Sequence, residues 1–260
     1  MKAGQVVLIT GGCGAIGAAT ASMLASAGAV LALVDRDEER LRATATQLSS
    51  LTRVLGLACD LSDFAELQRT VGRFESELGP IDVLVNNAAI AGPMGALRDA
   101  DLDAWDAVMR INYEAPLRLC RWLLPGMIDR DYGRIVNLAS RATTGFPGAN
   151  TPYSISKVAL TRLTAHVARE VAGTNVTANA VCPGAVQSGI WAEIRDNVRA
   201  RRTDASVDLL RYVDAVEAGG APPEDAGRLV LRILGDPEIN GALLFCEGAE
   251  QVVRPLVRGS

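Results

Sequence analysis

The stretch TGGCGAIGAAT occupies residues 10–20 and directly follows the strand-like run QVVLIT (5–10). Glycines at such a point let the chain turn tightly and let its backbone approach a pyrophosphate, which then sits at a helix N-terminus. The stretch can be aligned in two registers. Residues 12–17 match the general dinucleotide-binding pattern G-x-G-x-x-G, whereas T-G-x-x-x-G-x-G counted from Thr10 puts Ala15 where a glycine is expected. Both registers predict a nucleotide-binding turn between a strand and a helix.

Outward from this turn, short apolar runs alternate with longer segments of helical period. Most of the short runs are continuously apolar, as in a sheet that is buried on both faces. We expect strands at 5–10, 29–35, 53–60, 81–88, 134–140, 175–182 and 242–248, and helices near 15–27, 37–49, 62–78, 101–130, 152–172 and 223–235. This order predicts an α/β fold, a Rossmann-like doubly wound parallel sheet of about seven strands with helices on both faces. No linker or repeat interrupts it, so 1–260 is expected to be a single dinucleotide-binding catalytic domain.

The composition is that of an ordinary globular protein, with 260 residues of which 49% are hydrophobic and 22% charged. A net charge of -4 gives no reason to expect binding to nucleic acid or to an anionic membrane. No signal peptide and no membrane-spanning apolar stretch is recognisable. The five cysteines are scattered and indicate free thiols in a reducing cytoplasm. The single histidine, His166, excludes any site that needs two histidines, and no metal site is expected; the residue is expected at a packing or subunit surface.

Residues 188–221 interrupt the alternation, because charged residues crowd between the sixth strand and the last helix. A segment of this length inside a compact domain is more often functional than a plain loop. We therefore predict a substrate-binding flap at 188–221, with the charges of 195–202 on a solvated helical face. The candidate substrate contacts are Arg141, Phe146 and Trp191.

The second predicted strand ends at Asp35, 18 residues after Gly17, where an acidic residue meets the ribose 2′-hydroxyl in dinucleotide-binding folds. The alternative interpretation is that Asp35 only begins the solvated run DRDEER (35–40). A carboxylate at this place repels a 2′-phosphate, so Asp35 predicts NAD as the cofactor rather than NADP. Arg36 is the competing feature, because its guanidinium could bind that phosphate.

The fifth predicted strand ends at Ser140, and Tyr153 and Lys157 follow on a predicted helix. A tyrosine and a lysine at i and i+4 lie on one helix face. An ammonium beside a phenol stabilises the phenolate and lowers the tyrosine pKa from about 10, which creates an acid and base for alcohol and carbonyl chemistry. An ordinary surface pair is the alternative. The chain has only two lysines, Lys2 and Lys157, among its 26 lysine and arginine residues, which favours a specific use of the compact cation.

At these residues the sequence resembles the short-chain dehydrogenase/reductase family, from about residue 6 to residue 248. The resemblance rests on TGGCGAIG (10–17), Asp60-Leu61, NNAA (86–89), Asn112, Ser140, YSISK (153–157) and PGAVQS (183–188). It selects the register counted from Thr10. It implies an NAD-dependent oxidoreductase that interconverts a secondary alcohol and a ketone, assembled as a homotetramer or homodimer.

The resemblance also assigns roles to the matching residues. Those implied to contact the cofactor are Gly11, Gly14 and Ile16 at the phosphates, Asp60 and Leu61 at the adenine, Asn87 near its ribose, and Val186 and Ser188 at the nicotinamide carboxamide. Those implied in catalysis are Tyr153 as acid/base, Lys157 as the residue that binds the ribose and tunes Tyr153, Ser140 as the group that orients the substrate, and Asn112 as support for a water relay.

The chain departs from the family pattern in three places. Ala15 adds a methyl group beside the pyrophosphate, and the loop is expected to tolerate it by a small shift. Ser188 replaces the usual threonine and keeps its hydroxyl. Residues 247–249 read Glu-Gly-Ala where Asp-Gly-Gly is common, so contacts of the C-terminal tail are not carried over. Cys13 and Cys182 are expected to act as small apolar residues near the cofactor.

Other functions remain as alternatives. An NADPH-dependent reductase of the 3-oxoacyl-thioester type would use the same catalytic residues. A non-catalytic dinucleotide sensor would not need the complete set of Ser140, Tyr153 and Lys157. A dehalogenase-like lyase would resemble a Ser-Tyr-Arg arrangement without a nucleotide loop, and both Lys157 and residues 10–17 count against it.

Overall fold

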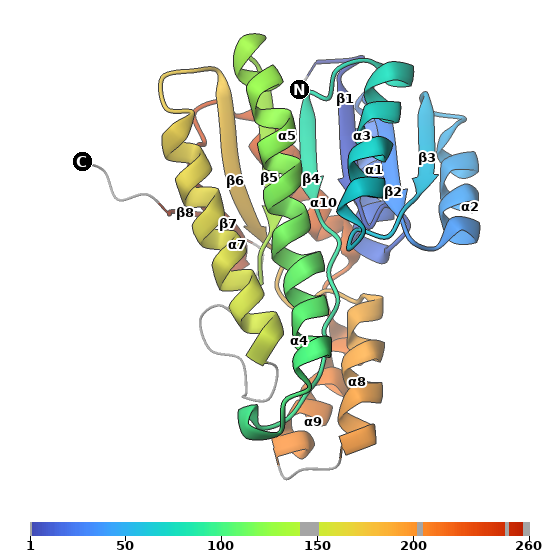
Figure 1. Cartoon of the computed structure of the whole chain (residues 1–260), viewed down its shortest axis with the longest axis vertical. Helices are drawn as coiled ribbons and strands as arrows, with labels where there is room; N and C mark the ends of the chain where they lie inside the picture. Colours follow the sequence, from blue (N-terminus) through green and yellow to red (C-terminus); the bar gives the residue numbers. More distant parts are fainter. Residues whose placement is uncertain (1, 141–150, 202–204, 248–249, 257–260) are drawn as a thin grey trace.

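The computed structural model describes residues 2–140, 151–201, 205–247 and 250–256. At its centre lies an eight-stranded sheet in the order β3-β2-β1-β4-β5-β6-β7-β8 (Figure 1). The first seven strands are parallel, and β8 pairs antiparallel with β7. The strands are β1 (Val6–Thr10), β2 (Val30–Asp35), β3 (Val54–Ala58), β4 (Val83–Asn86), β5 (Gly133–Leu138), β6 (Val176–Cys182), β7 (Ala242–Glu247) and β8 (Glu250–Pro255).

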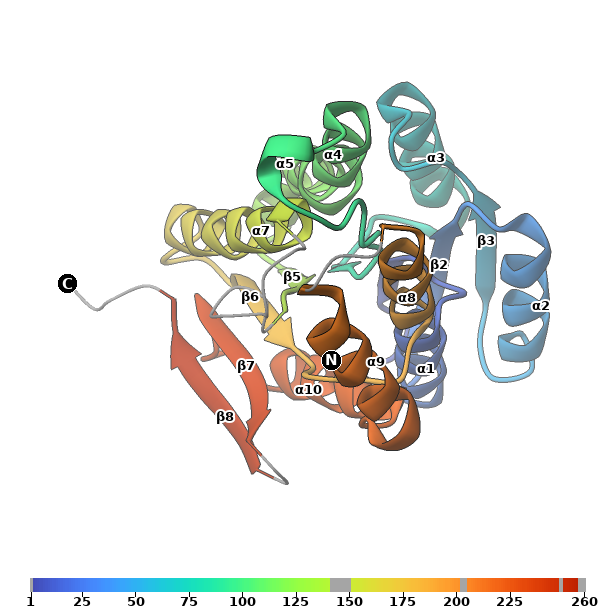
Figure 2. The same cartoon turned by 90° about the horizontal axis from the view of Figure 1, so that it is seen from below.

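Helices cover both faces of the sheet, as Figure 2 shows. One face packs against α1 (Ala15–Ser26), α2 (Glu38–Leu48) and α10 (Pro223–Gly235). The other packs against α3 (Phe64–Leu78), α5 (Ala115–Asp129) and α7 (Thr151–Glu170). These two apolar layers confirm the predicted doubly wound α/β sheet. No described helix is long and apolar enough to cross a membrane.

The structure differs from the sequence prediction at three places. An eighth strand, β8, was missed because a short edge strand with a half-exposed pattern carries little apolar signal. The helix expected at 101–130 is divided into α4 (Leu102–Met109), a π-helical turn η2 (Arg110–Glu114) and α5. Residues 188–221 contain two helices, α8 (Gly189–Arg201) and α9 (Ala205–Gly219).

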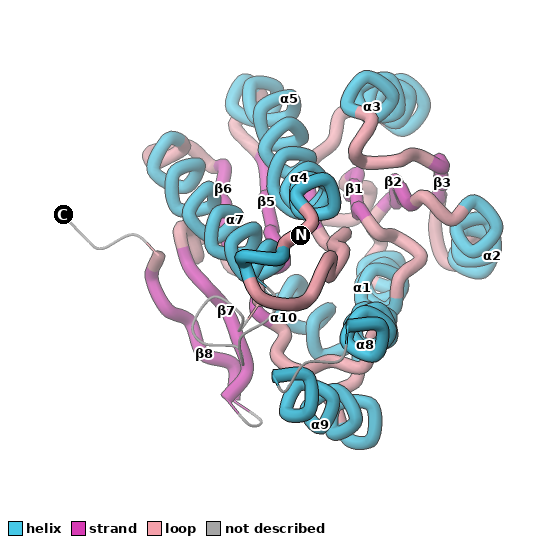
Figure 3. Tube along the Cα trace, turned by 60° about the horizontal axis from the view of Figure 1, so that its bottom comes forward, coloured by secondary structure: helices cyan, strands magenta, loops and turns pink. Residues whose placement is uncertain are grey.

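The helices α8 and α9 extend beyond the end of the sheet (Figures 1 and 3). A separate apolar cluster joins them to the segment after β4, which continues into the short 3₁₀ helix η1 (Leu97–Asp99). Its members include Ala91 and Met94 from that segment, Trp191 and Ile194 from α8, and Val213 from α9. Packing against the β4 segment therefore holds the helix pair over the carboxyl ends of the strands.

Candidate active site

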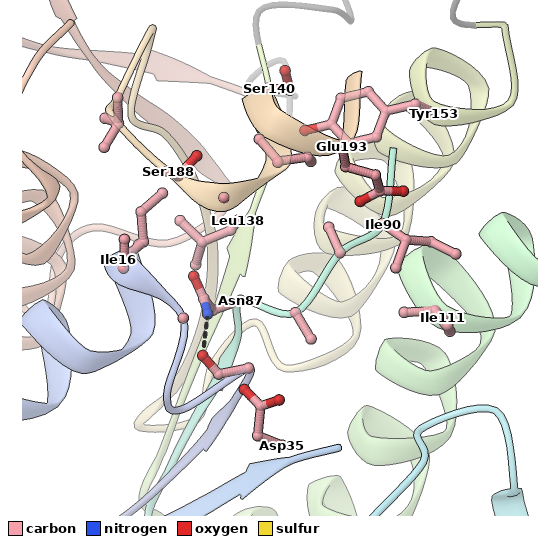
Figure 4. Close-up of a pocket in the computed structure, with 18 of the residues that line it drawn as sticks. Ile16, Asp35, Asn87, Ile90, Ile111, Leu138, Ser140, Tyr153, Ser188 and Glu193 are labelled. Carbon is pink, nitrogen blue, oxygen red and sulfur yellow. Dashed lines mark hydrogen bonds between the residues drawn. The ribbon is translucent and has the colours of Figure 1, made fainter. Parts of the chain in front are cut away.

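A cavity of about 500 Å³ lies at the carboxyl ends of the parallel strands, beneath α8. Ligands bind at this edge of open α/β sheets. Every predicted site residue except Asn112 lines the cavity: Gly11, Gly14, Ile16, Asp35, Asp60, Leu61, Asn87, Ser140, Tyr153, Lys157, Val186 and Ser188. Figure 4 shows Asp35 and Ile16 towards one end and Ser140 and Tyr153 towards the other.

The backbone of the glycine-rich loop explains which of its positions need glycine. Gly11 has a φ of +67°, a left-handed conformation that favours glycine. A Cβ on Gly17 would collide with the carbonyl oxygen of Gly11. Ala15 instead is the first residue of α1 and has no positive φ. Gly17 belongs to both registers, whereas Gly11 belongs only to the one counted from Thr10, and an alanine is accommodated at position 15.

The first turn of α1 differs from those of three other helices. Asp37, Asp63 and Asp101 cap α2, α3 and α4 by accepting hydrogen bonds from backbone N–H groups. At α1 the capping position is Gly14, which makes no side-chain hydrogen bond and itself lines the cavity. Uncapped N–H groups at a helix N-terminus attract a phosphate. This end of the cavity therefore fits the pyrophosphate of a dinucleotide.

Asn87 joins the glycine-rich loop to the end of β4. Its side-chain nitrogen donates hydrogen bonds to the carbonyl oxygens of Thr10 (2.9 Å) and Gly11 (3.1 Å). The hydroxyl of Thr10 accepts bonds from the backbone nitrogens of Asn87 (3.0 Å) and Ala88 (3.1 Å). Four bonds thus fix two segments that are far apart in the sequence. Gly11, Asn87 and Ala88 of these segments line the cavity, and Figure 4 shows one of the bonds made by Asn87.

The carboxylate of Asp35 is held in place at the end of β2. Its Oδ2 accepts a bond from the backbone nitrogen of Cys13, and its Oδ1 accepts one from that of Asp37, both at 3.3 Å. Arg40 donates to the carbonyl oxygen of Cys13 at 3.0 Å and, like Arg36, lines the cavity. Burial and the neighbouring Asp35 raise the pKa of Cys13 to about 12, so its thiol stays neutral, in keeping with the small apolar role expected of it.

Tyr153 and Lys157 lie on one face of α7 at the other end of the cavity. The Nζ of Lys157 is 5.7 Å from the centroid of the Tyr153 ring and donates to the carbonyl oxygen of Leu138 at 2.7 Å. Lys157 is only 2% exposed. The helix thus brings the phenol and the ammonium to the end of β5, beside Ser140.

The predicted effect of Lys157 on Tyr153 differs from what the structure shows. Burial raises the pKa of Tyr153 to about 12, and the charge of Glu193 acts in the same direction, while a hydrogen bond with Ser140 opposes them. Burial also lowers the pKa of Lys157 to about 8. Both shifts follow from the cost of placing a charge away from bulk water. Because the ammonium is directed at Leu138, it does not lower the pKa of the phenol in this arrangement.

Asn112 lies behind the cavity rather than in its wall. It is fully buried in the π-helical turn η2. Its side-chain oxygen accepts a bond from Ile90, and its nitrogen donates to the Ile90 carbonyl oxygen and to the hydroxyl of Ser156. Turns of π-helix frequently occur at functional sites. The Asn112 side chain therefore ties Ile90, which lines the cavity, to the helix that carries Tyr153.

The fate of the remaining candidates is mixed. Trp191 lines the cavity and donates from its indole to the carbonyl oxygen of Val186 at 2.7 Å. His166 is exposed on α7. Arg195 is not on a solvated face, since it pairs with Glu217 of α9 at 2.5 Å and is only partly exposed. Arg141 and Phe146 lie outside the described residues. No cluster of metal-binding side chains occurs in the part of the chain that the structure describes.

Sequence reasoning missed Glu193, which lines the cavity near Tyr153. The sequence feature that could have indicated this residue is its position in the helix. Trp191, Ile194 and Val198 form the buried side of α8, and Glu193 is a carboxylate beside these apolar positions. Without the fold, nothing showed that this side of the helix faces the cavity.

Known proteins resemble the chain over most of its length. Residues 5–199 match the family model described as short chain dehydrogenase. A short chain dehydrogenase of Pseudocercospora fijiensis is 37% identical over 73% of this chain, which corresponds to 62% of that protein. The 2-(S)-hydroxypropyl-CoM dehydrogenase 3 of Xanthobacter autotrophicus is 34% identical over 94% of this chain and 95% of its own. The structure of an NAD⁺-bound xylitol dehydrogenase has a TM-score of 0.83 at 28% identity and covers 94% of this chain and 97% of that one.

Proposed function

Because the chain belongs to the short-chain dehydrogenase/reductase family of oxidoreductases, we propose that it interconverts a secondary alcohol and a ketone with NAD as its cofactor. One observation carries the proposal. Ser140, Tyr153 and Lys157 meet at one end of a cavity whose other end holds an uncapped helix N-terminus and the carboxylate of Asp35. A binding-only protein would not need the three polar side chains at the first end.

When bound, the nicotinamide cofactor supplies or accepts the hydride. Tyr153 donates a proton to the substrate oxygen in the reduction, and in the oxidation its deprotonated form accepts the proton of the alcohol. A pKa raised to about 12 keeps its phenol protonated at neutral pH, so the group is ready to donate. Ser140 hydrogen-bonds the same substrate oxygen and fixes its position. Lys157 would bind the ribose through its ammonium, and its bond to Leu138 supports the cavity wall.

The choice of NAD rests on Asp35. Its two hydrogen bonds to backbone N–H groups fix the carboxylate at the wall where the adenosine ribose would lie. The alternative, an NADPH-dependent reductase of the 3-oxoacyl-thioester type, is favoured by Arg36 and Arg40, which line the same end of the cavity. The xylitol dehydrogenase to which this chain is similar was solved with NAD⁺.

The assembly is also a proposal. Ile155 and Val158 are 44% and 49% exposed on α7, and His166 is exposed on the same helix. Exposed apolar side chains that gather on one helix are typical of an interface. We propose a homotetramer or homodimer in the cytoplasm, and light scattering of the purified protein measures the mass that decides between these states.

An assay of NADH and NADPH absorbance tests the proposed function. The substrates are a panel of secondary alcohols with NAD⁺ or NADP⁺ and the matching ketones with NADH or NADPH. We expect turnover in both directions with a clear preference for NAD. Binding of cofactor without any turnover across the panel would favour the non-catalytic sensor, and preference for NADPH with thioester ketones would favour the alternative reductase.

A further inference from the structure

A carboxylate stands at the reacting end of the cavity, where neither the hydride nor the proton transfer needs one. Glu193 of α8 lines the cavity together with Tyr153, Ile90 and Ile111, and Figure 4 shows its side chain beside Tyr153. The two isoleucines are apolar. Apart from Lys157, whose ammonium is bonded to Leu138, Glu193 is the charged side chain at this end among the described residues. It therefore places a negative charge at the end of the cavity where the substrate would react.

One oxygen of Glu193 is already used by the backbone. Oε1 accepts hydrogen bonds from the nitrogens of Ala91 (3.0 Å) and Gly92 (3.2 Å), two successive N–H groups in the segment after β4. Gly92 has a φ of +72°, and a side chain there would collide with Val108, so this backbone conformation is specific to glycine. Within the described residues Oε2 accepts no such bond, which leaves it available inside the cavity.

Asn197, one helical turn further along α8, contacts the same segment. Its side-chain nitrogen donates to the carbonyl oxygen of Gly92 at 3.0 Å. Both residues therefore fasten α8 to the β4 segment. They differ in one respect, because Glu193 lines the cavity and Asn197 does not. A variant of Asn197 therefore serves as a control, because it weakens the attachment of α8 to the β4 segment without removing the charge of Glu193.

We propose that Glu193 determines substrate specificity by accepting, through Oε2, a hydrogen bond from a donor group next to the reacting carbon, so that the substrate is a vicinal diol or amino alcohol rather than an anionic hydroxy acid. This half-buried carboxylate keeps one oxygen free to accept a charge-assisted hydrogen bond, and a hydroxyl or ammonium supplies the donor. A carboxylate, sulfonate or phosphate at the same place would lie close to a like charge and lose affinity. This inference rests on the proposed alcohol oxidation and names its substrate class.

The test compares Glu193→Gln with wild type on four compounds: butane-2,3-diol, 1-aminopropan-2-ol, butan-2-ol and 3-hydroxybutyrate. The glutamine can keep the bonds to Ala91 and Gly92 through its carbonyl oxygen, while an uncharged amide nitrogen replaces Oε2. Wild type should oxidise the diol and the amino alcohol with a kcat/KM at least about 10-fold above that for butan-2-ol. In Glu193→Gln both ratios should fall by about 10-fold, and 3-hydroxybutyrate should become a better substrate.

Asn197→Ala is the matched control. It removes one bond between α8 and the β4 segment and leaves the charge, so it should lower kcat/KM for all four compounds by a similar factor. Unchanged ratios in Glu193→Gln, or wild-type oxidation of 3-hydroxybutyrate as good as that of the diol, would overturn the inference while butan-2-ol turnover still supports the proposed function. No turnover of any compound with either cofactor would overturn both.

Discussion

Lys157 donates a hydrogen bond from its ammonium to the carbonyl oxygen of Leu138, the last residue of β5, at 2.7 Å. The pair links α7 to the sheet within the wall of the cavity. Burial lowers the pKa of Lys157 from 10.5 to about 8, so the charged form is less favourable in the folded protein than in the unfolded chain. The protein therefore keeps a buried cation at the expense of stability.

This cost predicts that Lys157→Met stabilises the protein at pH 7 and inactivates it. A shift of this size corresponds to roughly 3 kcal/mol, and losing the charge-assisted bond to Leu138 costs about 2 kcal/mol. We therefore expect the free energy of unfolding to rise by roughly 1 kcal/mol in urea titrations at pH 7.

The pH dependence of this difference checks its origin. The folded pKa lies below the unfolded value, so wild type gains stability as pH rises from about 8 towards 10.5, where the folded lysine loses its proton first. The advantage of Lys157→Met should accordingly shrink at pH 10. An advantage that stays constant from pH 7 to pH 10 would assign it to packing instead of charge.

Tyr153→Phe should abolish turnover and leave the dissociation constant of NADH nearly unchanged. The hydroxyl is needed when the proton moves, whereas the ring still fills the same space. Stopped-flow or steady-state rates give kcat, and NADH fluorescence titration gives the affinity. If the variant keeps more than a tenth of the wild-type kcat, Tyr153 is not the proton donor.

Lys157 should also set the alkaline limit of ketone reduction. The phenol of Tyr153 stays protonated well above neutral pH because burial raises its pKa to about 12. Because the pKa of Lys157 is lowered to about 8, Lys157 loses its proton before Tyr153 does as the pH rises. We expect kcat/KM for reduction to be level from pH 6 to about pH 8 and to fall above it as the lysine loses its charge. A fall that begins near pH 6 would assign the limit to another group.

The indole of Trp191 should hold α8 in place over the cavity. Its N–H donates to Val186 at 2.7 Å, and the side chain is 8% exposed. Trp191→Phe keeps an aromatic ring but leaves that carbonyl oxygen without the indole donor, so amide exchange in α8 should accelerate and KM should rise several-fold.

Residues 188–221 are predicted to close over the substrate. In wild type, adding substrate and cofactor should slow amide exchange in 188–221 more than in the central strands, since lids come from the less stable parts of a fold. Equal protection of α8 and β5, unchanged by ligand, would contradict a closing lid.

The sequence predicted the sheet and twelve of the residues that line the cavity, because these depend on local patterns. The apolar run of β1 and the glycines that follow it are adjacent in the chain, and Tyr153 and Lys157 are only four residues apart. Glu193 and the buried state of Lys157 depend on contacts between distant segments, which a pattern of neighbours does not contain. The pKa shift of Tyr153 was expected in the wrong direction for the same reason, since burial raises this pKa and the nearby ammonium is directed at Leu138.

Asp35 lies at the end of the cavity where the adenosine would bind, and it should make the protein bind NAD⁺ about 100-fold more tightly than NADP⁺. Two unit charges about 4 Å apart repel by on the order of 4 kcal/mol at an effective dielectric of 20. Solvent reduces this, and 100-fold corresponds to about 2.7 kcal/mol. The bonds from Cys13 and Asp37 keep the carboxylate from turning away from a 2′-phosphate.

Asp35→Ala should reduce the difference between the dissociation constants of NAD⁺ and NADP⁺, because it weakens the binding of NAD⁺ and strengthens that of NADP⁺. Calorimetric titration without substrate measures both constants. Arg36→Ala is the control. Arg36 is exposed at the rim of the same end, and its attraction for a phosphate requires the side chain to become ordered, whereas the fixed carboxylate repels without rearrangement. Removal of Arg36 should therefore leave the preference for NAD⁺ intact. Tighter binding of NADP⁺ by wild type, reversed in Arg36→Ala, would make Arg36 the selecting residue and refute the role of Asp35.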